Sequence, residues 1–244
     1  MKKIVLIVGD SPSGKTFTAC RYVESSKLSS VVYDVNNEMA YAKWTKVSPK
    51  KVKKAFRIAE KSNVRVSLDS TTFDNKQILS TALELFESSI KNNYNLILES
   101  CEIYMHSNPR FLLHFENAIQ KMKHINNEGS IILIFNNLIK VPLWYIDYAD
   151  VIIVHKARSL ENLFKIGIGV PGLEQQVGVA SFLVDSINKR DGTTFASCWI
   201  DTRTNKIQGQ FNNHAFDNAC IEYIKHFKLA EALEHFGLND YRPG

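Results

Sequence analysis

The sequence predicts an α/β fold of three layers, in which helices cover both faces of a mainly parallel central sheet. Short apolar runs typical of buried strands alternate along the chain with longer segments of helical periodicity, and βαβ units produce this alternation. The 244 residues, 45% of them hydrophobic, suffice for one large core. We therefore expect a single domain over residues 1–244, with a core over 1–170 and a C-terminal extension over 171–244.

The expected strands are rich in valine, isoleucine and leucine, as strands buried on both faces are. They comprise residues 4–8, 31–33, 64–68, 96–98, 131–135 and 151–154. Helical periodicity predicts helices over residues 17–23, over 78–90 and from Pro109 to the polar turn at 126–129. Because helices separate several of these strands, the strands are expected to run mainly parallel.

The pattern changes after residue 170. Residues 173–187 predict another helix, and two strands at 195–200 and 206–211 flank a turn at 201–205, which indicates a β-hairpin. Two short helices near 216–227 and 229–236 are expected to follow. We interpret this C-terminal part as an extension of the same sheet.

The segment after the first expected strand carries the most specific motif of the chain. It matches G-x-x-x-x-G-K-[ST], the phosphate-binding P-loop, and lies between a strand and a helix as that motif requires. The loop amides are expected to bind a polyphosphate, Lys15 to reach the β- and γ-phosphates, and Thr16 to bind Mg²⁺. The expected ligands are therefore ATP and Mg²⁺. The predicted nucleotide-binding residues are Gly9, Asp10, Ser11, Pro12, Ser13, Gly14, Lys15, Thr16 and Phe17.

Polar residues at the ends of two later strands are the candidates for the rest of an active site. Glu99 follows the strand at 96–98 and is the predicted Mg²⁺ ligand beside Thr16, and Glu102 is the predicted base for the attacking water. The usual pattern is an adjacent Asp-Glu pair, whereas Ser100 follows Glu99 here. Asn136 ends the next strand and is predicted to sense the γ-phosphate. Strand-ending roles without catalysis stay open for Glu99 and Asn136.

Further short segments give the chain its resemblance to a known family. The strand at 31–33 leads into Asp34-x-x-x-Glu38, and Tyr148-Ala149-Asp150 precedes an apolar strand. With the order of the motifs and the closing hairpin, these segments resemble the FtsK/HerA superfamily of ring-forming ATPases, in particular viral genome-packaging ATPases. The resemblance covers most of residues 2–211. The same segments also fit the Zot-like phage assembly ATPases, which usually carry a membrane helix.

The resemblance implies a RecA/ASCE-like P-loop ATPase that hydrolyses ATP and moves or packages DNA as a homo-oligomeric ring. In such rings an arginine of the neighbouring subunit completes each site. Arg158, after the last core strand, is the favoured candidate, and Arg110 is the other. A capsid or portal protein is an expected partner, because packaging ATPases act on a capsid.

The charge pattern is compatible with nucleic acid. The net charge is +5, and the strongest basic cluster runs from Lys43 to Arg57. These residues suit contacts with DNA phosphates, which would be independent of base sequence. We prefer the simpler interpretation of a solvated amphipathic helix with Val52 and Phe56 inward, and both interpretations stay open.

The remaining features concern compartment and metal. The four cysteines are scattered, without a C-x-x-C pair, which indicates reduced thiols and no metal site of their own. No apolar run approaches the length of a membrane span. A cytoplasmic protein is expected, in the host cytoplasm or the virion if the source is viral.

Two alternative functions stay open. One is a P-loop kinase of a nucleotide or another small molecule, and the other is a nucleotide-binding assembly protein that hydrolyses poorly. Strand order separates the first from a ring ATPase. The strand that ends in the Mg²⁺-binding acid lies next to the P-loop strand in kinases, whereas another strand intervenes in ring ATPases.

Overall fold

The structure is a computed structural model that describes residues 2–67, 75–105, 109–122, 124–136, 141, 143–156, 173–192, 194–204 and 206–209. The chain forms two compact units. The first comprises Met1–Ile7 and Lys15–Asn136, and the second comprises Val8–Gly14 and Asn137–Gly244. The P-loop is therefore shared, because its first residues belong to the second unit and Lys15 and Thr16 to the first. The expected division at residue 170 stays a prediction.

The first unit holds a sheet with strand order β3-β4-β2-β5-β6-β1, whose registered pairs are all parallel. Its strands are β1 (Lys3–Val8), β2 (Ser30–Asp34), β3 (Thr45–Val47), β4 (Val64–Ser67), β5 (Asn95–Leu98) and β6 (Ser130–Phe135). Every residue of β2, β5 and β6 is buried, as expected of strands covered on both faces. The predicted parallel sheet is confirmed, and β3 is an additional strand.

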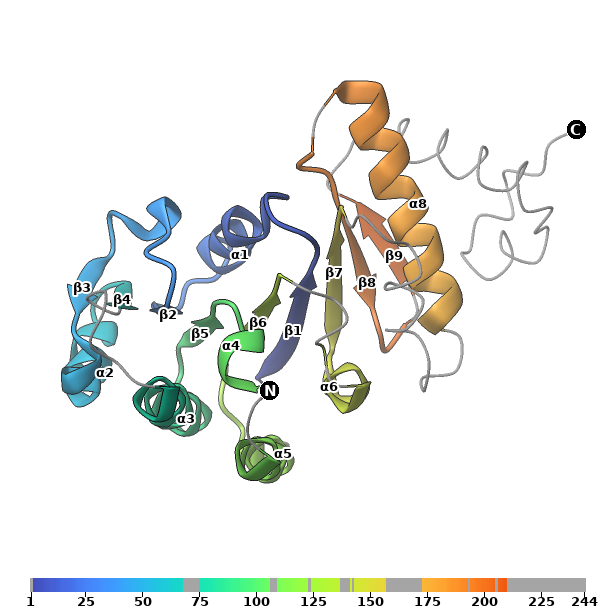
Figure 1. Cartoon of the computed structure of the whole chain (residues 1–244). Helices are drawn as coiled ribbons and strands as arrows, with labels where there is room; N and C mark the ends of the chain where they lie inside the picture. The colour runs from blue at the N-terminus through green and yellow to red at the C-terminus, as the bar shows by residue number, and fades with distance from the viewer. Residues whose placement is uncertain are drawn as a thin grey trace, which may run out of the picture. The chain divides into compact units, whose positions relative to one another are not determined.

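Helices cover this sheet on both sides. Helix α1 (Lys15–Glu24) packs against β6, and the others lie on the opposite side, where α3 contacts β5 and α5 contacts α3 (Figure 1). These others are α2 (Val52–Ala59), α3 (Asn75–Lys91) and α5 (Pro109–Met122). Shorter elements are η1 (Met39–Tyr41), η2 (Pro49–Lys51) and α4 (Glu102–Met105). The predicted three-layer α/β class is confirmed.

The order of the strands separates two of the functions left open by the sequence. Strand β6 lies between β1, which leads into the P-loop, and β5, which ends just before Glu99. An intervening strand is the arrangement expected of ring ATPases, and the direct neighbour expected of small-molecule kinases is absent from this sheet. The kinase interpretation therefore loses its structural basis.

The second unit contains the strands β7 (Val151–His155), β8 (Ser197–Asp201) and β9 (Lys206–Gly209), which pair in antiparallel fashion. This confirms the predicted hairpin within the described residues. Helix α8 (Leu173–Asp191) packs on β7 and β8, and α6 (Leu143–Tyr148) precedes β7. The short helices expected near 216–227 and 229–236 lie outside the described residues. In the part of the chain that the structure describes, no helix has the length and apolarity needed to cross a membrane.

Candidate functional site

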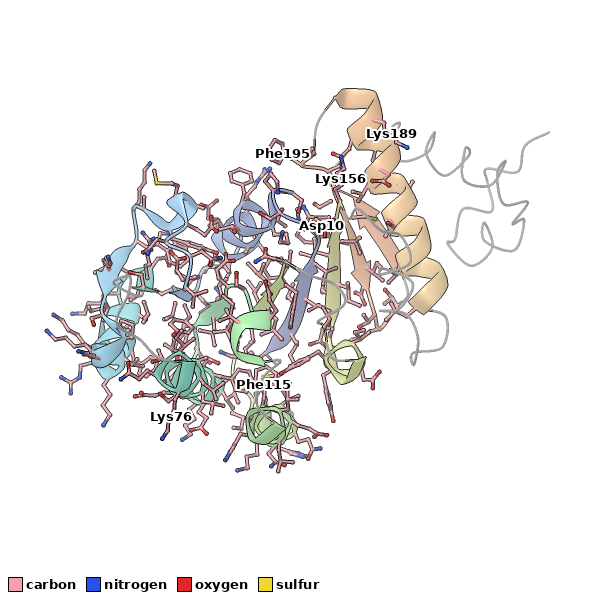
Figure 2. All side chains as sticks on the ribbon, viewed as in Figure 1. Asp10, Lys76, Phe115, Lys156, Lys189 and Phe195 are labelled. Atoms are coloured by element: carbon pink, nitrogen blue, oxygen red, sulfur yellow. The ribbon has the colours of Figure 1, made fainter. Side chains whose placement is uncertain are left out.

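The P-loop is held in the second unit by the carboxyl end of β7. The Asp10 amide donates a hydrogen bond to the Lys156 carbonyl at 2.9 Å, and the ring Nδ1 of His155 lies 2.6 Å from the Ser13 carbonyl oxygen. A carbonyl oxygen only accepts, so Nδ1 of this fully buried histidine carries the hydrogen. Figure 2 shows Asp10 and Lys156 at this end of β7. The loop is thus held at Asp10 and at Ser13, both by residues at the carboxyl end of β7.

The two glycines of the motif are required by this packing. A Cβ atom on Gly9 would lie 2.6 Å from Cβ of His155, which is too close for any side chain. Gly14 has a φ of +84°, in the region that favours glycine, and a Cβ there would meet the Phe195 ring at 3.2 Å. Between them Ser11 and Pro12 are exposed, and Ser13 is buried. The loop therefore closes tightly against its support while its tip faces outward.

In the first unit, Glu99 is brought together with Thr16. Helix α1 begins at Lys15, which is buried, and the half-buried Thr16 forms a hydrogen bond with the Glu99 carboxylate. Glu99 is 1% exposed, and its Oε1 accepts a hydrogen bond of 2.6 Å from the Tyr41 hydroxyl. The two side chains predicted to bind Mg²⁺ thus lie side by side. The contact with Tyr41 was not predicted.

The surroundings of Glu99 favour a bound cation. Burial raises the pKa of Glu99 to about 7, the negative charges of Glu38 and Asp34 add to this rise, and the hydrogen bonds from Tyr41 and Thr16 oppose it. A divalent cation beside the carboxylate would stabilise its ionised form. The described residues contain no cluster of three or more potential metal-ligating acids, histidines or cysteines. Mg²⁺ needs none, because one carboxylate, a hydroxyl, phosphate oxygens and waters complete its shell.

Ser100 connects the ends of three strands. Its hydroxyl oxygen accepts hydrogen bonds from the side-chain amides of Asn36 (2.6 Å) and Asn136 (2.7 Å), which follow β2 and β6. Ser100 has a φ of +50°, an uncommon conformation for a residue other than glycine. Asn136 therefore lies next to the residue after Glu99, and its role as a γ-phosphate sensor stays a prediction. The sequence marked Ser100 only as a departure from the usual acid.

Glu102, the predicted base, lies at the start of α4. Its Oε2 accepts a hydrogen bond of 3.2 Å from the backbone amide of Asn136, so the carboxylate is tied to the end of β6. The role of Glu102 in catalysis stays a prediction. Of the two candidate arginines, Arg110 belongs to the first turn of α5, and Arg158 lies outside the described residues.

The Asp34-x-x-x-Glu38 segment is organised by an ion pair between a buried aspartate and a partly exposed arginine. Asp34 is fully buried, and its Oδ2 lies 2.7 Å from Nε of Arg65 on the neighbouring strand β4. Both Asp34 oxygens also accept hydrogen bonds from the Glu38 amide, at 3.1 and 3.0 Å. The aspartate thereby shapes the turn after β2, near Glu99. Arg65 was not singled out by the sequence, since its partner is 31 residues away.

Together, the strand order, the P-loop and the buried acid after β5 define the fold of P-loop NTPases. No family model matches the chain, and no curated protein matches its sequence. Among solved structures, the chain is similar to the genome-packaging NTPase B204 of Sulfolobus turreted icosahedral virus 2. In the AMPPCP complex the TM-score is 0.58 at 16% identity, and the match covers 85% of this chain and 96% of B204.

Two further structures agree. The ATP-γS complex of the same B204 gives a TM-score of 0.59, and B204 of Sulfolobus turreted icosahedral virus, described as a DNA-packaging ATPase, gives 0.56. Each is 16% identical and covers 85% of this chain and 96% of the B204 chain. The resemblance to packaging ATPases drawn from the sequence is thus confirmed for the fold, which is what identity at this level shows.

Proposed function

We propose that this protein is an ATPase whose P-loop, with Lys15, binds the phosphates of ATP and whose Thr16 and Glu99 hold Mg²⁺. The contact of Thr16 with the buried Glu99 carries the proposal, because it joins the end of the P-loop motif to an acid after a parallel strand. Asn136 contacts the γ-phosphate, and Glu102 positions the attacking water. When bound, Mg²⁺ neutralises charge that develops on the phosphates.

We propose further that the ATPase acts on DNA. A surface that we call the basic edge supports this. It comprises exposed basic residues on and next to β3, η2 and α2, namely Lys43, Lys46, Lys50, Lys51, Lys53, Lys54 and Arg57. Cations at this density suit the phosphate backbone, with an affinity that depends on salt and not on base sequence. The fold shared with B204 of Sulfolobus turreted icosahedral virus, a protein described as a DNA-packaging ATPase, is consistent with the proposal that this ATPase acts on DNA.

A homo-oligomeric ring is part of this proposal. An arginine from the neighbouring subunit, Arg158 in preference to Arg110, completes each site and stabilises charge in the transition state. A capsid or portal protein recruits the ring if the chain packages a genome. The protein then acts in the cytoplasm or the virion.

DNA stimulation tests the motor. We expect a mixed-sequence duplex to raise steady-state phosphate release several-fold at about 50 mM salt, and the effect to fall sharply by about 200 mM. Reversing the charge at Lys50, Lys53 and Lys54 to glutamate should remove most of this stimulation. The matched control reverses three exposed lysines on α3 and α5, Lys76, Lys91 and Lys121, and should be stimulated like the wild type (Figure 2 labels Lys76).

The other outcomes would argue against the DNA motor or against the role of the basic edge. Phosphate release that no nucleic acid changes would argue against a DNA motor. ATP binding without turnover argues for an assembly protein. Equal effects of the two triple variants would show that overall charge, and not the basic edge, sets the response.

His155 supplies a test of how the P-loop is held. We expect His155→Leu to weaken ATP binding about tenfold, because the buried Ser13 carbonyl loses its donor and the loop its fixed shape. His155→Asn places an amide N–H where Nδ1 stood and should bind ATP nearly as the wild type does. His155→Gln extends its amide to the Nε2 position instead and should resemble leucine. Calorimetric titration with ATP measures all three, and equal affinities for Asn and Leu would refute the role of this hydrogen bond.

A further inference from the structure

Phe195 is a large aromatic side chain exposed beside the P-loop. It is 65% exposed, although a phenyl ring in water forgoes a considerable hydrophobic gain. Its ring lies against Gly14, so closely that a Cβ on this glycine would be 3.2 Å from Cδ1. Figure 2 shows Phe195 at the same end of β7 as Asp10 and Lys156. An exposed ring at this position is available to a ligand that is bound at the P-loop.

The backbone that directly follows Phe195 is anchored within the second unit. The next residue, Ala196, donates its amide hydrogen to Oδ1 of Asn188 on α8 at 3.0 Å. Ser197 then begins β8 and is registered opposite His155, the residue that supports the P-loop. The ring is therefore presented from a fixed backbone, and ordering it on binding costs little conformational entropy.

From these contacts we infer that Phe195 is the platform on which the base of the bound nucleotide stacks. This inference rests on the proposed function, since it takes the P-loop to bind the phosphates of the same nucleotide. A phenyl face stacks with any flat aromatic ring, and it has no hydrogen-bonding groups that could distinguish one base from another. Purine nucleotides are therefore preferred over pyrimidine nucleotides through their larger area, with little discrimination between ATP and GTP.

Phe17, which directly follows the motif in sequence, is also an exposed aromatic side chain, at 62%. The guanidinium of Arg21 lies 5.8 Å from the centre of its ring, so this ring already has a cationic neighbour. Phe17 was among the residues predicted from the sequence to bind the nucleotide, whereas Phe195, about 180 residues further along, was not. The experiment must therefore distinguish the two rings.

Comparing ATP with inorganic tripolyphosphate separates base from phosphate binding. In calorimetric titrations with Mg²⁺, Phe195→Ala should weaken ATP binding about tenfold and leave tripolyphosphate binding within about twofold of the wild type. Phe195→Tyr keeps the aromatic face and should restore ATP affinity. Leu113→Ala on α5, at a side chain 59% exposed, is the matched surface control and should change neither. Wild-type affinity for CTP should be lower than for ATP and GTP.

The remaining outcomes overturn the inference in recognisable ways. Equal losses for ATP and tripolyphosphate would show that Phe195 only packs the loop. Unchanged ATP affinity in Phe195→Ala, or a loss specific to ATP in Phe17→Ala alone, would assign the base elsewhere and leave the proposed ATPase intact. A wild type that binds neither ligand would refute the proposed function itself, and the inference with it.

Discussion

Lys15→Ala is expected to lower the rate of ATP hydrolysis about a hundredfold or more. Lys15 is 4% exposed and opens α1 at the end of the P-loop motif, so its ammonium is poorly solvated and interacts strongly with phosphate charge. Its loss leaves part of the developing negative charge on the β- and γ-phosphates without a counter-charge. Steady-state phosphate release at saturating ATP measures the effect.

The control for this variant is Lys27→Ala, which removes an exposed lysine shortly after α1. It should hydrolyse ATP like the wild type. Thermal unfolding of both variants shows whether Lys15→Ala is folded when it is assayed. A folded Lys15→Ala protein with wild-type turnover would show that the P-loop lysine does not contribute to hydrolysis.

Glu99→Gln is expected to affect activity and stability in opposite directions. Glutamine keeps an oxygen that accepts the Tyr41 hydrogen bond but carries no charge for Mg²⁺, so hydrolysis should fall about a hundredfold. The wild-type carboxyl has a pKa raised by burial from 4.5 to about 7. Because the pKa of Glu99 is higher in the folded state, its contribution to the free energy of unfolding is fully present below pH 4.5. This contribution is lost as the pH rises through 7.

The size of the stability effect follows from the same values. The pKa of Glu99 is 4.5 in the unfolded state and about 7 in the folded state. At about 1.4 kcal/mol per pKa unit, this difference lowers the free energy of unfolding at high pH by roughly 3 kcal/mol. Without Mg²⁺, Glu99→Gln should therefore unfold at higher urea concentration than the wild type at pH 8. The advantage should shrink as the pH falls toward 5. At pH 8, Mg²⁺ with ATP should reduce the difference in stability between the variant and the wild type, because they bind and stabilise the wild type.

Two results would contradict this expectation for Glu99. A variant less stable than the wild type at pH 8 would show that ionised Glu99 is well solvated or paired. Undiminished hydrolysis would show that another residue holds the metal. Wild-type activity should also fall below pH 7, since protons then compete with Mg²⁺ for the same carboxylate.

Much of the fold was predictable because its signals are local. Runs such as Ser130–Phe135 are long, apolar and β-branched, and a strand buried on both faces needs nothing else. Strand β3 was missed for the opposite reason. It has three residues, of which only Val47 is buried, and it lies within a lysine-rich segment interpreted as a helix or a DNA contact. The helix interpretation is correct for α2, where Val52 is buried and Phe56 half-buried, and the DNA contact stays a prediction.

The site was predictable where one motif held it and not where distant residues meet. The P-loop and Glu99 follow from spacing and strand position. Tyr41, His155 and Phe195 make contacts that span 58 residues or more, and no local pattern marks Tyr41 or Phe195. One signal was available for His155: it is a histidine at the end of an apolar strand, at the sheet edge where α/β folds place their ligands.

Strand β3 has a paired neighbour on one side only in the described part of its sheet, so its outer amides and carbonyls offer a template for another strand. Lys46 within the strand and the lysines that flank it make such pairing costly, because two copies would bring like charges together. The charges proposed to attract DNA thus also protect the protein against edge-to-edge aggregation. Replacing lysines by alanine would remove both properties together, whereas reversal to glutamate changes the sign of the charge and keeps the edge protected.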